Sequence, residues 1–155
     1  MSTPSKRRPQ HDEHKQIGDY RVKNWLGEGV NGAVRLGIDV KTGAKVALKF
    51  MAKSAAIGKA MERLMREMRL LSLLHHPNIV TMYKVIETSE YFVMVMERVR
   101  KGELLSYITE HGHLSEQKFR PIFRSILSAI DYCHQNFVVH RDLKPGSCSC
   151  FLWFC

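Results

Sequence analysis

The hydrophobic pattern of this chain switches between alternation and a three-and-four spacing, and these switches limit the folds that the chain can adopt. From Tyr20 to about Met51, apolar and polar residues alternate around Gly-rich turns, which predicts antiparallel strands with "KTGAK" as a hairpin turn. Apolar residues then recur every three or four positions, which predicts a helix that faces a core. These residues are Met61, Leu64, Met65, Met68 and Leu71. A sheet with one long helix is therefore expected in the first half of the chain.

Helical patterns dominate the second half. "HHPNIV" ends the first helix, because the residue before Pro77 is disfavoured in the helical region, and two strand-like runs follow, "IVTMYKVIE" and "YFVMVME". After "VRKGE", the stretch "LLSYITEHG" predicts a short helix, and Ser115 begins a longer one that contains Pro121. The apolar residues of the longer helix are predicted to share one face: Phe119, Ile122, Phe123, Ile126, Leu127 and Ile130. The predicted fold class is α+β.

The composition fits one globular domain of an intracellular protein. The chain has 155 residues, of which 45% are hydrophobic and 25% are charged. It has no uncharged apolar run of about 18 residues and begins with a polar stretch, so neither a membrane span nor a secretion signal is expected. Of the four cysteines, Cys133 stands alone and the others crowd the last eight residues, which argues against a disulfide framework. We expect a cytoplasmic or nuclear protein.

The net charge of +9 raises the question of nucleic-acid binding, because clustered Lys and Arg release counterions from phosphates. The clusters are short, however. "SKRR" lies in a polar tail, and the other basic residues have the spacing of a solvated helix face. These residues are Lys59, Arg63, Arg66 and Arg69. Nucleic-acid binding is therefore not expected.

Three glycines form the first functional motif. Gly27, Gly29 and Gly32, followed by Val34, spell G-x-G-x-x-G-x-V, in which missing side chains let backbone N–H groups approach phosphate oxygens. The pattern alone is weak, because a tight hairpin explains it equally well. Strand-like sequence follows the glycines, whereas dinucleotide-binding motifs continue directly into a helix. The dinucleotide interpretation is therefore rejected.

One lysine lies in the middle of an apolar strand. Lys49 ends "VALK", and a half-buried cation in such a run needs an anion. Glu67 on the predicted helix can supply it, and the pair would hold Lys49 against the phosphates of a nucleotide. Glu62 is the rival partner, but a pairing with Arg66 four residues later explains it better.

A His-Arg-Asp triplet at residues 140–142 completes the set of motifs. Asp142 could accept a hydroxyl proton, and Lys144 could stabilise a transferred phosphoryl group. The triplet alone is common and usually structural. The ordered series of glycine loop, strand lysine, helix glutamate and His-Arg-Asp rarely arises by chance.

This ordered series resembles that of the eukaryotic protein kinases, from about Ile17 to Pro145. "DLKP" points to serine/threonine specificity, and "HPNIV" and "AIDYCHQNFVVHRDLKP" are similar to the calcium/calmodulin-dependent kinase group, especially relatives of the AMP-activated kinase. The resemblance implies a complete N-terminal lobe, made of an antiparallel sheet plus one helix, and an incomplete helical C-terminal lobe. It also implies transfer of the γ-phosphate of ATP to Ser or Thr hydroxyls of protein substrates.

The resemblance assigns a role to each site residue. Asp142 would be the base, Lys144 a phosphoryl stabiliser, and Lys49 with Glu67 the phosphate clamp. The residues expected to bind ATP are Leu26, Gly27, Glu28, Gly29, Gly32, Val34, Ala47, Lys49, Met96, Glu97, Val99 and Glu103. Among these, Met96 would be the gatekeeper next to adenine. Glu97 and Val99 would supply the backbone contacts to adenine, and Glu103 the ribose contact; Leu26, Val34 and Ala47 would line the adenine pocket.

The family pattern stops at Pro145. Ser147 takes the position of an Asn that helps to hold Mg²⁺ in the family, and the 155 residues contain no Asp-Phe-Gly. Mg²⁺ is implied by the family, but we expect no protein ligands for a metal in these residues. Because one oxyanion-type contact alone is worth about 3 kcal/mol, losing the metal ligands should remove nearly all turnover.

The tail "GSCSCFLWFC" has no counterpart in the family. The preferred interpretation is non-family sequence, from an alternative transcript end or an incorrect gene model. The alternatives are a zinc site made by Cys148, Cys150 and Cys155 with His140, and a hydrophobic or acylated membrane anchor.

The expected organisation has four segments. They are a disordered tail (1–16), the N-lobe and hinge (17–100), a partial C-lobe (101–145) and a non-family tail (146–155). The apolar face of the last helix would lack its cover, so a partner that completes the C-lobe is expected. The alternative function is a non-catalytic nucleotide-binding or regulatory fragment, similar to a pseudokinase.

We predict that the 155-residue polypeptide transfers no phosphate from ATP to a basic Ser/Thr peptide, because its sequence lacks the Asn and Asp-Phe-Gly metal ligands. A radiolabelled phosphotransfer assay with Mg²⁺ tests this. Turnover that Lys49→Ala abolishes would contradict the prediction, whereas turnover that survives Lys49→Ala would come from a contaminating kinase.

Overall fold

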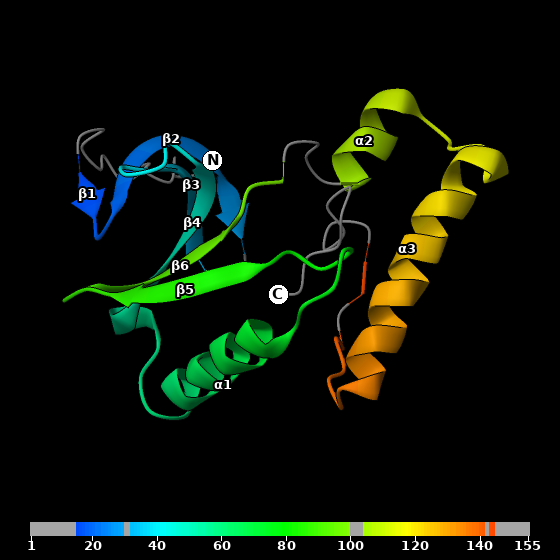
Figure 1. The fold of residues 1–155 in the computed structure, drawn as a ribbon. Coiled ribbons are helices and arrows are strands. Elements are labelled where there is room, and N and C mark those ends of the chain that lie inside the picture. Colours follow the sequence, from blue (N-terminus) through cyan, green and yellow to red (C-terminus); the bar gives the residue numbers. More distant parts are fainter. Residues whose placement is uncertain (1–14, 30–31, 100–103, 142, 145–155) are drawn as a thin grey trace, which may run out of the picture.

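A curled antiparallel sheet forms one half of the described chain, and helices form the other (Figure 1). The computed structural model describes residues 15–29, 32–99, 104–141 and 143–144. Six strands pair in the order β1-β2-β3-β4-β6-β5. The strands are β1 (Gln16–Ile17), β2 (Tyr20–Gly29), β3 (Gly32–Asp39), β4 (Lys45–Ala52), β5 (Met82–Glu87) and β6 (Tyr91–Glu97). The helices are the 3₁₀ turn η1 (Lys53–Ala55), α1 (Lys59–Leu73), α2 (Leu104–His111) and α3 (Glu116–Gln135). This arrangement confirms the predicted α+β class.

The turn between β3 and β4 forms at the predicted "KTGAK" segment. Asp39 Oδ1 accepts the backbone N–H groups of Lys41 and Thr42, each at 2.9 Å. The bond from the Thr42 N–H is the main cause that lowers the pKa of Asp39 below its usual value. Gly43 adopts a φ of +71°, which favours glycine. The turn sets the register in which Val34 lies opposite Lys49.

Strand β2 is irregular, and Arg35 of β3 stabilises the irregular part. The register between β2 and β3 shifts on both sides of Trp25. Arg35 is 9% exposed, and its Nε donates to the carbonyl oxygen of Lys23 at 3.0 Å. A bulge of this kind bends a strand and increases its twist. The curl of the sheet in Figure 1 follows from this irregularity.

Alternation along β4 divides the core between the two faces of the sheet. Val46, Leu48 and Phe50 belong to one buried cluster, whereas Ala47 and Met51 belong to a second cluster on the opposite face. Helix α1 covers the second face (Figure 1). Its contacts come from Met68, which is buried, and from Met61, Leu64 and Leu71. The predicted inward position of Met65 is wrong, because its side chain is 47% exposed.

A third cluster joins the end of α1 to the helical half. Leu74 and Ile79 pack with Leu104 of α2 and with Ala129 and Cys133 of α3. Ser115 is the N-cap residue of α3, as predicted, and Pro121 lies inside the helix. The six large apolar residues of α3 are buried to different extents. Ile122 and Ile126 pack against the third cluster, whereas Phe123 and Leu127 are about half exposed, because the described neighbours of α3 lie on one side only.

Two histidines after α1 connect the sheet half to α3. The N–H of His75 donates to the Tyr132 hydroxyl at 3.1 Å, and the His76 ring stacks on the Tyr132 ring with centroids 5.1 Å apart. His76 Nδ1 accepts the N–H of Asn78, so Nε2 carries the proton and donates to Ser128 Oγ at 3.2 Å. This junction fixes α1 relative to α3. In the described part of the chain, no helix combines the length and apolar character needed to cross a bilayer.

Removing the Tyr132 hydroxyl should loosen this junction. Tyr132→Phe leaves the His75 N–H without its acceptor, so we expect the free energy of unfolding to fall by about 1 kcal/mol. Tyr83→Phe is the control, because Tyr83 is 56% exposed and its variant should change stability by less than about 0.5 kcal/mol. Urea denaturation measures both, and equal stabilities of the two variants would refute the role of the Tyr132 hydroxyl.

Candidate functional site

Lys49 is a charged side chain in the buried interior of the sheet. It lies in the middle of β4, opposite Val34 of β3 and Met94 of β6, and it is only 4% exposed. The residues on either side of it in the strand point to the other face, where they belong to the first core cluster. A buried cation is strongly destabilising unless polar or charged groups compensate it. The fold therefore holds a cation where an anion can be bound.

A pocket of about 590 Å³ brings together Lys49 and Glu67 with the segment that leads to Asp142. We call it the lysine pocket. The sheet contributes Lys49 and Met94, and α1 contributes Glu67 and Met68. Residues 137–141, after α3, form the opposite wall. Two of the four predicted catalytic residues thus share one cavity, while the ion pair between them stays a prediction.

The segment that forms this wall has unusual backbone angles. Phe137 has a φ of +58° and Arg141 a φ of +66°, values that cost roughly 1 kcal/mol or more for residues other than glycine. Such strain tends to occur at functional sites. Asp142 follows Arg141 directly but lies outside the described residues, as does Glu103. Lys144 is exposed.

The residues predicted to surround adenine gather on the α1-facing side of the sheet. Ala47 and Met96 lie opposite each other in β4 and β6 and are each 4% exposed. Val34 and Val99 pack against the same cluster. Leu26 of β2 is 43% exposed. An apolar surface of this kind, next to a buried cation, suits a flat ring that carries phosphates.

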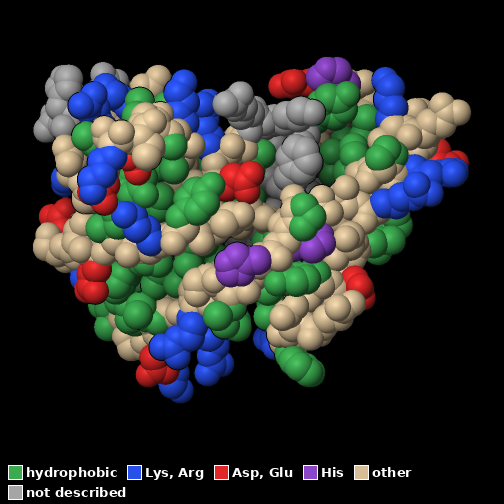
Figure 2. Space-filling view, viewed as in Figure 1, with side chains coloured by type: hydrophobic (Ala, Val, Ile, Leu, Met, Phe, Trp, Pro, Cys, Tyr) green, Lys and Arg blue, Asp and Glu red, His purple; other side chains and the backbone are tan. Residues whose placement is uncertain are grey.

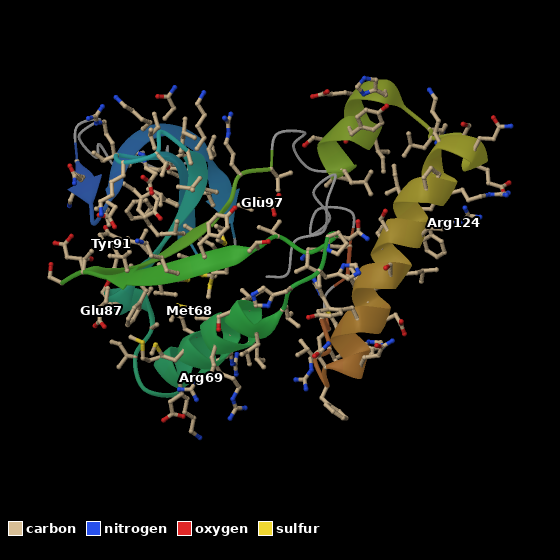
Figure 3. The ribbon with its side chains drawn as sticks, viewed as in Figure 1. Met68, Arg69, Glu87, Tyr91, Glu97 and Arg124 are labelled. Atoms are coloured by element: carbon tan, nitrogen blue, oxygen red, sulfur yellow. The ribbon has the colours of Figure 1, made fainter. Side chains whose placement is uncertain are left out.

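Glu97 ends β6 and is held by Thr81, the residue that precedes β5. Its N–H donates to the Thr81 carbonyl oxygen at 2.9 Å, and its Oε2 accepts the Thr81 N–H at 3.3 Å. Figure 3 shows Glu97 at the end of the sheet nearest to the helical half. These bonds fix the backbone at the start of the predicted hinge.

The glycine motif lies at the end of the β2–β3 hairpin. Gly27 pairs with Val34, Glu28 with Ala33, and Gly29 with Gly32. The motif thus lies between two strands, as predicted, and the dinucleotide interpretation is excluded. For Glu28 and Gly29 only the strand position is described, and residues 30–31 lie outside the described part.

The third glycine is required by the fold itself. Gly32 has a φ of +141°, and a Cβ there would lie 1.9 Å from the Phe50 carbonyl oxygen of β4. Gly27 differs, because a Cβ there would meet nothing within 4 Å. Gly32 therefore lets β3 approach β4, while Gly27 faces open space that a ligand can occupy.

The described residues offer few other side chains that could bind a metal or act as a nucleophile. No group of three or more His, Cys, Asp or Glu side chains there could hold a metal ion, and the three cysteines of the zinc alternative lie outside this part of the chain. Burial raises the pKa of the Cys133 thiol to about 11, so Cys133 is not a nucleophile at neutral pH.

A second pocket of about 530 Å³, lined in part by Trp25, Arg35 and Arg63, was missed by the sequence reasoning. Glu67 and Leu64 line both pockets, so α1 separates them. The sequence pattern places Arg63 on a solvated basic face, and Figure 2 shows Lys and Arg side chains gathered below α1. Arg63 also lines the second pocket. No motif marks this pocket, because its wall depends on the bulge in β2 and on the path of the β4–α1 connection.

The comparisons with known proteins assign this fold and site to a family. The model of the family described as "Protein kinase domain" matches residues 20–147. The chain belongs to this family. It is 44% identical over 130 residues to the SNF1-related protein kinase catalytic subunit alpha KIN12 of Arabidopsis thaliana, covering 83% of this chain and 26% of that protein.

The fold also matches a solved protein kinase. The crystal structure of Rad53 1–466 in complex with AMP-PNP superimposes with a TM-score of 0.79 at 36% identity, covering 83% of this chain and 34% of that chain. The chain therefore spans about a quarter to a third of the relatives it matches. In kinase terms, the sheet with α1 is the N-terminal lobe, and α2 with α3 belongs to the C-terminal lobe. The predicted resemblance to serine/threonine kinases is confirmed.

The two glycines should respond differently to the same substitution. We expect Gly32→Ala to lower the free energy of unfolding by about 2 kcal/mol, because its Cβ meets the β4 backbone in a strained conformation. Gly27→Ala should be neutral or stabilising by up to about 1 kcal/mol, because alanine is preferred over glycine inside a strand. Thermal unfolding of both variants tests this, and equal loss at the two positions would contradict it.

Proposed function

We propose that this chain supplies the nucleotide-binding lobe and the catalytic-loop segment of an ATP-dependent protein kinase that acts on Ser and Thr hydroxyls. The observation that carries the proposal is the burial of Lys49 on the wall of the lysine pocket, between Glu67 and the segment that leads to Asp142. Membership of the kinase family and the 44% identity to an SNF1-related kinase support it.

ATP fits the described residues in three ways. Ala47 and Met96 offer an apolar surface for adenine, with Val34 and Val99 beside them. The Lys49 side chain lies on the same face of the sheet, one alternation further along β4, where it would contact the phosphates. Gly27 leaves open space above the bound nucleotide. Glu28, Gly29 and Glu103 keep their predicted contacts to ATP as part of this proposal.

The chemistry follows from these positions. ATP supplies the γ-phosphoryl group. Asp142 would accept the proton of the attacking hydroxyl, and Lys144 would stabilise the phosphoryl group as its bond to the β-phosphate oxygen breaks. Glu67 would orient Lys49. Mg²⁺ is the expected metal of the family, and Ser147 offers only a hydroxyl where a metal-binding Asn is expected.

A non-catalytic fragment that binds nucleotide is the second candidate. The presence of Ser147 favours it, because a serine hydroxyl is a weaker ligand for Mg²⁺ than an amide or carboxylate oxygen. Nucleotide binding without phosphate transfer distinguishes it from an active kinase. A cooperatively folded polypeptide that binds no nucleotide would contradict both candidates.

Nucleotide binding should depend on Lys49 and not on nearby lysines. We expect Lys49→Ala to weaken binding of Mg-ATP by tenfold or more, because a charge-assisted hydrogen bond contributes about 1.5 to 3 kcal/mol. Lys53→Ala is the control, since Lys53 follows the same strand but pairs with Glu87. Calorimetric titration measures both, after circular dichroism confirms that the variants fold. Equal affinities would contradict the proposal.

A further inference from the structure

One apolar surface of the described chain has no role in the proposed nucleotide site. Phe119, Phe123, Leu127 and Ile130 lie at intervals of three and four along α3, so they form one stripe, which we call the outer α3 stripe. Phe123 is 47% and Leu127 48% exposed, and the rings of Phe119 and Phe123 lie 5.8 Å apart. None of the four belongs to the third core cluster, which uses Ile122, Ile126, Ala129 and Cys133 on the adjacent side of the helix.

The outer α3 stripe is apolar, and part of its charged border is paired within the helix. Arg120 forms an ion pair with Glu116 at 2.6 Å. Figure 3 shows Arg124 pointing away from the sheet half. An occupant that covers the stripe must bring apolar and preferably aromatic side chains.

We propose that residues 151–155 of this chain, "FLWFC", cover the outer α3 stripe in the 155-residue polypeptide. Phe151, Leu152, Trp153 and Phe154 are four consecutive large apolar residues, and residues 146–155 contain no charged side chain. Aromatic rings at these positions can pack on the paired rings of Phe119 and Phe123. The proposal does not depend on nucleotide binding.

The chain has ample length to make this contact. Val138 packs with Cys133 near the end of α3, and Phe123 lies ten residues earlier in the helix, a distance of about 15 Å along its axis. The thirteen residues from Val138 to Phe151 can span up to roughly 40 Å. The tail can therefore return along α3 without moving the described elements.

The lysine pocket is a less suitable place for the same tail. Lys49, Arg63, Arg66 and Arg141 all line it. Against these cations the lining supplies one carboxylate, that of Glu67, and the tail would add only its terminal carboxylate. An apolar segment in this pocket would therefore remove water from cations that it cannot fully compensate, which is unfavourable. The outer α3 stripe imposes no such cost, because its described members are apolar.

Trp153 provides a direct probe of the proposal. The chain contains two tryptophans, so a Trp25→Phe background leaves Trp153 as the single emitter. We expect acrylamide to quench Trp153 several-fold less in the folded monomer than in the same polypeptide unfolded in urea. Sedimentation at each concentration confirms the monomeric state. Quenching of the folded monomer that equals the unfolded value would overturn the proposal.

Three charged substitutions locate the docking site. Leu127→Glu should raise the quenching of Trp153 to the unfolded value, because it places a charge in the outer α3 stripe. Leu105→Glu is the matched control, since Leu105 of α2 is also 48% exposed, and it should leave Trp153 protected. Leu70→Glu changes a wall of the lysine pocket and should also leave protection intact. Loss of protection by Leu70→Glu but not by Leu127→Glu would overturn the proposal.

A second measurement applies if Leu127→Glu fails to fold. With Cys148 and Cys150 replaced by Ser, oxidation should link Cys155 to the introduced thiol of Leu127→Cys within one molecule, and several-fold faster than to that of Leu105→Cys. Peptide mapping identifies the link. Equal rates at the two positions would overturn the proposal. Protection of Trp153 that appears only when the sedimenting mass doubles would instead assign the stripe to a second copy of the chain, and would also overturn it.

Discussion

A lysine buried in the middle of a strand is the constraint on which the rest of this structure depends. Lys49 is 4% exposed, and its neighbours Leu48 and Phe50 are anchored in the core on the other face. A slip of one residue in β4 would move the charge into that core and the core residues out of it, so the register is strongly specified. The Asp39 turn and the close approach of Gly32 to β4 both hold this register. The same features that stabilise the sheet therefore place a cation beside the lysine pocket.

The site also requires that α1, which bears Glu67, stays fixed relative to both the sheet and the helical half. Met68 packs into the sheet cluster, while Leu74, just beyond the helix, packs with α2 and α3. The hydrogen bond from His75 and the stacking of His76, both to Tyr132, add a polar connection to α3. Because residues 137–141 follow α3 directly, this connection also positions the segment that precedes Asp142.

Much of the site was predictable, because its residues follow local periodicities. Alternation predicted the strands around Lys49, and the glycine motif could be placed in a hairpin because strand-like sequence follows it. Burial on particular helix faces was not predictable from the same patterns. Met65 has helical spacing but faces away from the described core, since apolar spacing does not reveal which neighbours cover a helix. The role of Arg35 depends on a bulge whose position no short-range rule gives.

The central claim concerns the place where nucleotide binds. The nucleotide is proposed to lie on the α1-facing side of the sheet, with Ala47 and Lys49 of β4 on one side and the hinge on the other. Methyl NMR of the 155-residue polypeptide during titration with Mg-ATP tests this most directly. The account predicts that the largest shifts occur at Val34, Ala47, Met96 and Val99, which share one cluster. Shifts confined to Ala55, Ala56 and Ala60, which line the second pocket, would contradict it.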